Sequence, residues 1–178
     1  MNNPFREDLV SRNLAEACSV VIFGATGDLT HRKLIPALYN LAIDGELPAG
    51  VKILGFARRD WSDEFFREGL KKLNRQFSRT GHDEEIWESL AANIEYHKSE
   101  FQDKDGYKRL SDRLDEIDRE RGGKGNRLFY IASAPEYFDD ILLNLKAAGL
   151  SQERLDCDGC WSRVIVEKPF GTTLETAQ

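Results

Sequence analysis

Cysteine is scarce in this sequence, and its three residues form no framework. An odd number of cysteines in a chain of 178 residues argues against a fold held together by disulfides. Cys157 and Cys160 form a CxxC motif, which can belong to a zinc site or a redox pair. Zinc would need two more ligands, and neither a second CxxC nor paired histidines follow. The motif also lies in Asp-Gly loop sequence, so we interpret both residues as ordinary loop cysteines.

Long apolar runs and an excess of positive charge are also absent. No stretch approaches the roughly 20 apolar residues that a membrane-spanning helix needs. Residues 1–17, a polar N-terminal leader, lack the apolar segment of a signal peptide. The formal net charge of -6 offers no basic surface for nucleic acid. We therefore expect a cytoplasmic protein that engages neither membrane nor nucleic acid. The scattered histidines, His31, His82 and His97, lack the spacing of metal ligands, so we expect no metal.

The sequence does contain an alternation of strand-like and helix-like segments. Short apolar runs typical of buried strands occupy residues 19–23, 51–57, 94–97, 128–132 and 163–166. Segments with helical spacing of apolar residues lie between them, at 29–42, 62–77, 84–92, 107–121 and 135–149. This order predicts an α/β fold over residues 18–178. We expect a Rossmann-type, doubly wound, mainly parallel sheet with helices on both faces.

The first helical segment contains a proline that disturbs it. Pro36 has no backbone N–H and crowds Arg32, four residues earlier. We therefore expect regular helix to begin near Ile35, with Arg32 and Lys33 on an irregular turn.

A glycine-containing turn follows the first predicted strand: Gly24-Ala25-Thr26-Gly27-Asp28-Leu29. Glycine lets the backbone approach a pyrophosphate, and the helix that follows directs N–H groups and a partial positive charge at that anion. The first strand-to-helix turn is where a Rossmann fold binds its coenzyme. The spacing departs from GxGxxG, because Thr26 and Leu29 replace the later glycines. On this segment alone, an ordinary strand-to-helix turn explains the residues equally well.

Two arginines end the second predicted strand. In NAD-binding folds an acid near this point accepts the ribose 2′-hydroxyl, whereas here Arg58 and Arg59 occupy the place. Guanidinium groups match phosphate geometry, so the pair favours NADP over NAD. Asp60 follows directly and argues the other way, and solvated loop charges are the alternative. We expect NADP as coenzyme, with NAD at lower affinity.

The last predicted strand also ends in charged residues, Glu167-Lys168-Pro169-Phe170-Gly171. Open α/β sheets bind ligands at the carboxyl ends of their strands, where Lys168 could donate to a ligand oxygen. A cis peptide before Pro169 would suit a sharp turn at such a site. A strand-to-helix turn with a solvated lysine is the alternative.

Two of these motifs together resemble one known family. Residues 24–39, GATGDLTHRKLIPALY, are similar to the coenzyme turn and first helix of glucose-6-phosphate dehydrogenases. Residues 163–171, RVIVEKPFG, resemble the EKPFG signature of the same family, in the same order and separation. Residues 129–135 are similar to its fourth-strand segment, although Ala134 replaces the first of two prolines common there. The resemblance covers nearly the whole chain after the leader.

The resemblance implies a reaction and a set of contacts. Members oxidise glucose 6-phosphate at C1 to 6-phosphogluconolactone and reduce NADP⁺. The substrate side would include Lys168, which would also contact the coenzyme, and Lys33. The coenzyme site would comprise Gly24, Ala25, Thr26, Gly27, Asp28 and Leu29 at the pyrophosphate, Arg58 and Arg59 at the 2′-phosphate, Ser99 and Glu100 near the adenosine, and Ala132 to Pro135 near the nicotinamide.

The resemblance also implies what these 178 residues lack. The family's general base is a histidine in a second-domain motif of the form RIDHYLGKE, which does not occur here. That domain also forms the oligomer, a homodimer or homotetramer. Residues 174–178 are typical of a helix just starting, so we expect a piece of a longer protein that binds NADP without turnover. A stand-alone NADP-binding module and another NADP-dependent sugar oxidoreductase are the alternatives.

Overall fold

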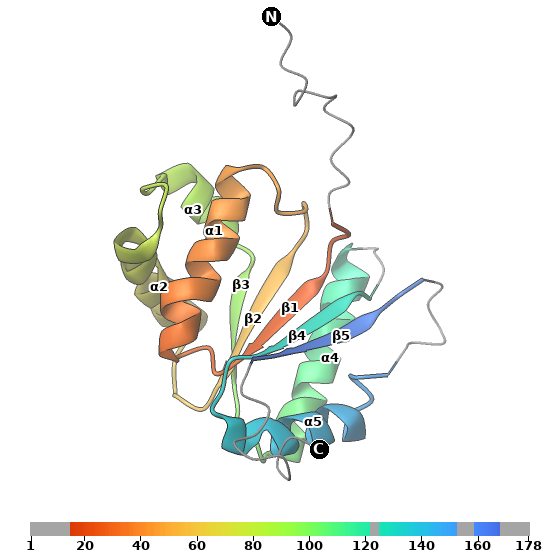
Figure 1. Ribbon diagram of the computed structural model, residues 1–178. Coiled ribbons are helices and arrows are strands. Elements are labelled where there is room, and N and C mark those ends of the chain that lie inside the picture. The colour runs from red at the N-terminus through yellow and green to blue at the C-terminus, as the bar shows by residue number, and fades with distance from the viewer. Residues whose placement is uncertain (1–14, 122–124, 153–158, 168–178) are drawn as a thin grey trace, which may run out of the picture.

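Five strands form one parallel sheet in the order β3-β2-β1-β4-β5 (Figure 1). The structure is a computed structural model that describes residues 15–121, 125–152 and 159–167. The strands are β1 (Ser19–Phe23), β2 (Lys52–Ala57), β3 (Ile94–Lys98), β4 (Arg127–Ile131) and β5 (Ser162–Val166). The predicted Rossmann-type architecture is confirmed.

Helices cover both faces of the sheet (Figure 1). One face carries α1 (Ile35–Ile43), α2 (Asp63–Phe77) and α3 (Glu84–Ala91), and the other carries α4 (Lys104–Arg121) and α5 (Phe138–Ala147). Alternate residues of the buried strands face opposite sides, which divides the core in two. On the first side Val20 and Ile22 of β1 pack with helix residues such as Tyr39 and Trp87.

The second half of the core is rich in aromatic rings. Phe23 of β1 lies 4.7 Å from Phe56 of β2 between ring centroids, and 5.9 Å from Tyr107 of α4. Phe129 and Ile141 belong to the same cluster and are fully buried. Since each aromatic side chain removes a large apolar area from water, this cluster firmly attaches α4 and α5 to the sheet.

Local signals explain where the helices begin. The Ser62 side chain accepts a hydrogen bond from the Phe65 amide, and the Asp83 side chain accepts from the amides of Glu85 and Ile86. Both residues therefore act as N-caps, as expected for serine and aspartate. Helix α4 begins three residues earlier than predicted, at Lys104, where Asp103 accepts from the Asp105 amide.

The irregular turn expected before Ile35 is a π-helical turn. It spans Thr30–Leu34 and is labelled η1, and α1 continues from it with Pro36 near its first position. Within a continuous helix a proline lacks one backbone donor and crowds the carbonyl four residues earlier, and the helix departs from regular α-helical spacing in the π-helical turn directly before Pro36. A further short turn, the 3₁₀ helix η2 (Pro135–Tyr137), precedes α5.

The outer edge of β3 is closed by two side chains of α2. The Tyr96 amide donates to Asp63 Oδ1 at 2.6 Å, and Arg67 Nε donates to the Ile94 carbonyl at 2.6 Å. Asp63 and Arg67 also pair with each other at 3.4 Å. Unpaired edge groups are a template for association with another strand, and these two side chains occupy them.

One expectation from the sequence is wrong, and several others concern residues that the structure does not describe. Cys160 is disulfide-bonded, so it is not the ordinary loop thiol that the sequence suggested. Cys157, Lys168, Pro169 and most of the N-terminal leader lie outside the described residues. Within the part of the chain that the structure describes, no helix has the length and apolar character needed to cross a membrane.

Candidate functional site

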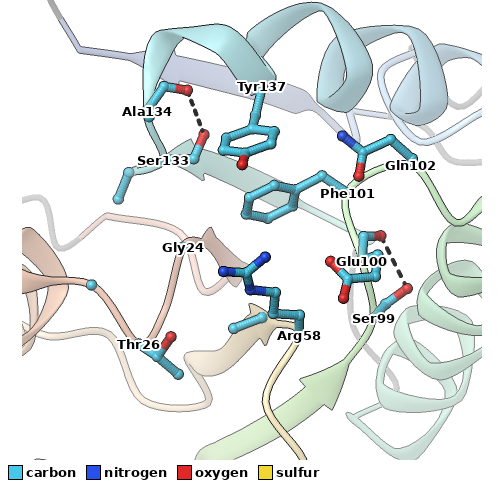
Figure 2. Close-up of a pocket in the computed structure, with 13 residues that line it drawn as sticks. Gly24, Thr26, Arg58, Ser99, Glu100, Phe101, Gln102, Ser133, Ala134 and Tyr137 are labelled. Atoms are coloured by element: carbon cyan, nitrogen blue, oxygen red, sulfur yellow. Dashed lines mark hydrogen bonds between the residues drawn. The ribbon is translucent and has the colours of Figure 1, made fainter.

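A cavity of about 420 Å³ opens at the carboxyl ends of four strands (Figure 2). The chain runs outward from β1 to β2 and β3 on one side and to β4 and β5 on the other, so the cavity lies at the topological switch point. Its lining residues all follow strand ends: Gly24, Thr26 and Gly27 after β1; Ala57 and Arg58 at β2; Ser99, Glu100, Phe101 and Gln102 after β3; Ala132, Ser133, Ala134 and Tyr137 after β4.

Gly24 can only be glycine in this backbone. Its φ is +85°, and a Cβ there would lie 2.8 Å from the Ala132 carbonyl oxygen. Both the Gly24 amide and the Ala25 amide donate to the Phe56 carbonyl, at 3.0 and 3.3 Å. The turn after β1 is therefore tied to β2 and pressed against the end of β4.

The same turn leads into a helix whose N-terminal end lies at the cavity. The Gly27 amide and the Thr30 hydroxyl donate to the Gly24 carbonyl, and the first helical bond runs from the His31 amide to the Gly27 carbonyl at 3.2 Å. The amides of Asp28 and Leu29 lie in the first helical turn, where a helix has no carbonyl to offer them. Such amides and the helix dipole make this end of the cavity suited to an anion.

The remaining turn residues serve packing more than the cavity. Ala25 is fully buried beside Gly55, where an added Cβ would lie 2.9 Å from Ala25 Cβ and 2.6 Å from the Phe66 ring. Asp28 pairs with Arg32 at 2.6 Å on the surface. The side chains of Ala25, Asp28 and Leu29 do not line the cavity. Asp28 and Leu29 can therefore contribute to anion binding only through their backbone amides.

The two predicted arginines have different surroundings. Arg58 lines the cavity, and Figure 2 shows its guanidinium facing the same space as the Glu100 carboxylate. Arg59 instead lies over the Trp61 ring, 5.0 Å from its centroid, and does not line the cavity. Asp60, the residue that argued against NADP, pairs with Lys98 at 2.8 Å.

A neutral histidine lies near this rim. Burial lowers the pKa of His31 below its ordinary value, and the nearby Arg59 lowers it further, while Asp28 acts in the opposite direction. His31 is therefore mostly uncharged at neutral pH and adds little positive charge beside Arg59.

The segment after β3 is held close to α4. Ser99 is buried, and its hydroxyl is 3.2 Å from both the Glu100 carbonyl and Asp103 Oδ2. A Cβ on Gly106 would lie 1.8 Å from Ser99 Oγ, so glycine there permits the approach. Glu100 is left exposed at the cavity, as a carboxylate available to a ligand.

Sequence reasoning missed four residues that line the cavity: Ala57, Phe101, Gln102 and Tyr137. The rings of Phe101 and Tyr137 lie 5.1 Å apart and form an apolar wall beside Arg58 (Figure 2). The Phe101 carbonyl accepts from Tyr107 Oη at 3.0 Å and Asn144 Nδ2 at 2.9 Å, which fixes this segment against both α4 and α5. The available signal was position, since Phe101 directly follows Ser99 and Glu100.

Some predicted site residues do not reach the cavity. Pro135 is exposed at the start of η2, although Ala132 of the same turn lines the cavity. Lys33 is exposed on η1 and is not a lining residue. Among the described ranges, no group of three or more histidine, cysteine or acidic residues is placed to hold a metal ion.

A family model described as "Glucose-6-phosphate dehydrogenase, NAD binding domain" matches residues 21–178. A glucose-6-phosphate 1-dehydrogenase of Chlamydia pneumoniae is 44% identical over 181 aligned residues, which cover 100% of this chain and 35% of the relative. The enzyme of the same description from Chlamydia muridarum is 47% identical over 162 residues, covering 90% and 32%.

Solved structures give the same result. A glucose-6-phosphate dehydrogenase in complex with its substrate glucose-6-phosphate superposes with a TM-score of 0.80 at 34% identity, covering 92% of this chain and 33% of that one. A glucose-6-phosphate 1-dehydrogenase from Mycobacterium avium gives 0.75 at 29% identity, covering 91% and 32%. The chain thus spans about a third of the length of the relatives that it matches.

Proposed function

The chain belongs to the glucose-6-phosphate dehydrogenase family, and we propose that its cavity holds NADP⁺ for the oxidation of glucose 6-phosphate at C1 to 6-phosphogluconolactone. The observation that carries this proposal is the pairing of two anion-binding features in one cavity. The helix-opening glycine turn lies at one side and the Arg58 guanidinium at another. The first suits the pyrophosphate that all dinucleotides share, and the second suits the 2′-phosphate that only NADP carries.

The other lining residues have roles consistent with a dinucleotide. Ser99 and Glu100 follow β3, next to β2, and so lie on the side of Arg58, where the adenosine would pass. Ala132 and Ser133 follow β4, on the far side of the glycine turn, and would approach the nicotinamide. Lys168 and Lys33 remain the proposed contacts to the sugar phosphate.

Oxidation at C1 moves a hydride to the nicotinamide and the hydroxyl proton to a base, and it needs both partners held in one geometry. No histidine is among the described residues that line the cavity. The base expected from the family resemblance belongs to a motif that these 178 residues do not contain. We therefore propose that this chain alone binds the coenzyme and does not turn over substrate.

The coenzyme proposal is tested by calorimetric titration of Arg58→Ala with NADP⁺ and with NAD⁺. Loss of a charge-assisted contact costs about 2 kcal/mol, so NADP⁺ binding should weaken about thirtyfold. Binding of NAD⁺ should change less than about twofold, because NAD⁺ has no 2′-phosphate.

Two further arginines serve as controls. Arg59→Ala should have a much smaller effect, because that guanidinium lies over Trp61 and outside the cavity. Arg119→Ala, which removes an exposed arginine of α4 bonded to the Asp115 carbonyl, should have none. Equal weakening of NADP⁺ and NAD⁺ by Arg58→Ala would overturn the assignment of Arg58.

A turnover assay tests the second part of the proposal. With NADP⁺ and glucose 6-phosphate, the 178 residues alone should form no NADPH above background, whereas the protein at its full natural length should. Measurable turnover by the 178 residues would show that they contain the base after all.

A further inference from the structure

The turn that carries Arg58, residues 58–61, is tied to β3 by two side chains; we call this segment the arginine turn. The Tyr96 hydroxyl donates to the Arg59 carbonyl at 2.8 Å. Lys98 Nζ lies 2.8 Å from Asp60 Oδ1. Both contacts come from the edge strand, whose last residue, Lys98, pairs in register with Ala57 at the end of β2.

Tyr96 is itself held in place from several directions. Its amide donates to Asp63 Oδ1 at 2.6 Å. Its ring centroid lies 5.0 Å from that of Phe66 and 5.9 Å from that of Trp61. Burial raises the pKa of Tyr96, so the hydroxyl keeps its proton and remains a donor. A fixed backbone and a packed ring leave the hydroxyl one defined direction, toward the arginine turn.

Lys98 acts on charge more than on position. Asp60 is two residues from Arg58, and an unpaired carboxylate there would attract the guanidinium and repel a bound phosphate. The side chains of Lys98 and Asp60 are 54% and 87% exposed, so their ion pair contributes little to folding. Its effect should therefore be visible in phosphate binding and not in stability.

We propose that Tyr96 and Lys98 are positioning residues for coenzyme choice: Tyr96 fixes the arginine turn so that Arg58 faces the cavity, and Lys98 keeps the Asp60 carboxylate from competing for Arg58. The inference rests on the proposed role of Arg58 at the 2′-phosphate. Neither residue lines the cavity, so both act through the turn and not by touching the coenzyme.

The first test is Tyr96→Phe, which keeps the ring and removes only the hydroxyl. In the protein at its full natural length, loss of one hydrogen bond should weaken NADP⁺ binding about threefold to tenfold. Binding of NAD⁺ should change less than about twofold, since NAD⁺ does not use Arg58. A purely structural role for Tyr96 would weaken both coenzymes alike, and that result would overturn the proposal.

The control is Tyr39→Phe, which likewise removes a tyrosine hydroxyl that bonds to loop backbone. Tyr39 Oη accepts from the Asp83 amide at 2.6 Å, on the α1–α3 side and away from the cavity. This variant should lower the melting temperature and leave the ratio of NADP⁺ to NAD⁺ affinity unchanged. A change in that ratio would show that any lost hydroxyl alters coenzyme choice, which would overturn a specific role for Tyr96.

Lys98 is tested by a loss and a rescue. Lys98→Met should weaken NADP⁺ binding about threefold, and Asp60→Asn added to it should restore the affinity, because no carboxylate then needs neutralising. If Asp60→Asn does not restore the affinity, Lys98 attracts the coenzyme phosphate directly and does not act by neutralising Asp60. That result would overturn the role proposed for Lys98.

A double-mutant cycle separates this inference from the proposed function. If Tyr96 acts through Arg58, then Tyr96→Phe should cost no further NADP⁺ affinity in an Arg58→Ala background. Additive losses would overturn the positioning role while leaving Arg58 in place. If Arg58→Ala itself fails to discriminate between the coenzymes, the proposed function is wrong at that residue, whatever Tyr96 does.

Discussion

At the scale of single residues, Gly24 carries the most demanding geometry of the cavity. Replacement by alanine would place a side chain at φ +85° and a Cβ 2.8 Å from the Ala132 carbonyl oxygen. We expect Gly24→Ala to lower the free energy of unfolding by about 2 kcal/mol or more, from backbone strain and overpacking together. Binding of NADP⁺ and of NAD⁺ should both weaken, because both use this turn.

Urea denaturation and calorimetry measure the two effects. Gly45→Ala is the matched control, since Gly45 has φ +67° and no neighbouring atom within 4 Å of the added Cβ. It should cost only about 1 kcal/mol and leave coenzyme binding unchanged. If both variants lose the same stability, the close approach of Gly24 to Ala132 is unimportant.

His97 makes stability depend on pH. Its ring stacks on Phe56, and burial lowers its pKa, with Arg109 acting in the same direction and the Gly106 carbonyl and Asp103 opposing. A histidine with a lowered pKa in the folded state favours the neutral form. Its contribution is present above the ordinary value of about 6.5 and is lost as the pH falls from there through the lower folded pKa.

The comparison with His97→Gln isolates this contribution. Between pH 7.5 and about 5, the free energy of unfolding of the parent protein should fall more than that of the variant. Parallel pH profiles for the two proteins would show that His97 does not titrate differently on folding.

Sequence patterns located much of the cavity but not its apolar wall. Gly24, Thr26 and Arg58 follow strand ends in a recognisable order, and the structure brings them together. The position of Phe101 after Ser99 and Glu100 was the available signal, but the sequence does not show that its ring faces the cavity, because the hydrogen bonds that fix this segment come from Tyr107 of α4 and Asn144 of α5. Tyr137 follows β4 at a greater distance and carries no such signal. The sequence also could not show that Arg58 lines the cavity and Arg59 does not, because that difference depends on the stacking of Arg59 over the Trp61 ring.

At the scale of elements, the closure of the β3 edge gives a prediction about association. The double variant Asp63→Ala, Arg67→Ala removes the acceptor for the Tyr96 amide and the donor to the Ile94 carbonyl. Hydrogen exchange at the Tyr96 amide should become about tenfold faster. The exposed edge should also promote concentration-dependent self-association, because another strand can then pair with it.

Exchange mass spectrometry and sedimentation velocity measure these changes. Arg75→Ala is the control on the same helix, since Arg75 pairs only with Glu84 among the described contacts. Unchanged exchange at Tyr96 in the double variant would contradict a protective role for these side chains.

The boundaries of elements show what sequence can and cannot predict. Short buried strands were located within about a residue, because apolar runs between turn signals leave few alternatives. The start of α4 was missed because Gly106 disfavours helix by itself, and only its contact with Ser99 accounts for a glycine there. Pro36 predicted an irregular turn before α1 but not that the turn would be π-helical.

At the scale of the whole molecule, coenzyme binding should stabilise the fold. The cavity joins segments that follow four strands, so a bound dinucleotide would connect both halves of the sheet. At 100 times its dissociation constant, NADP⁺ should add about 2.7 kcal/mol to the free energy of unfolding. For a domain of this size that raises the melting temperature by roughly 5 to 10 °C.

Differential scanning fluorimetry with this chain checks the expectation. NAD⁺ at the same concentration should give a smaller rise, and Arg58→Ala should remove most of the difference between the two coenzymes. No rise with either coenzyme would mean that the chain on its own does not form the site.

The π-helical turn η1 is equivalent to an α-helical turn with one inserted residue. Each residue of an α-helix rotates the chain by about 100°, so the surplus residue lets Thr30 face Gly24 while Ile35 still faces the sheet. Deleting one residue between His31 and Leu34 would regularise the helix and turn Thr30 away from the glycine turn. The length of this segment is thus constrained as well as its composition: substitutions at the exposed Arg32 and Lys33 leave the Thr30 contact in place, whereas a single deletion would misalign the coenzyme turn with its own helix.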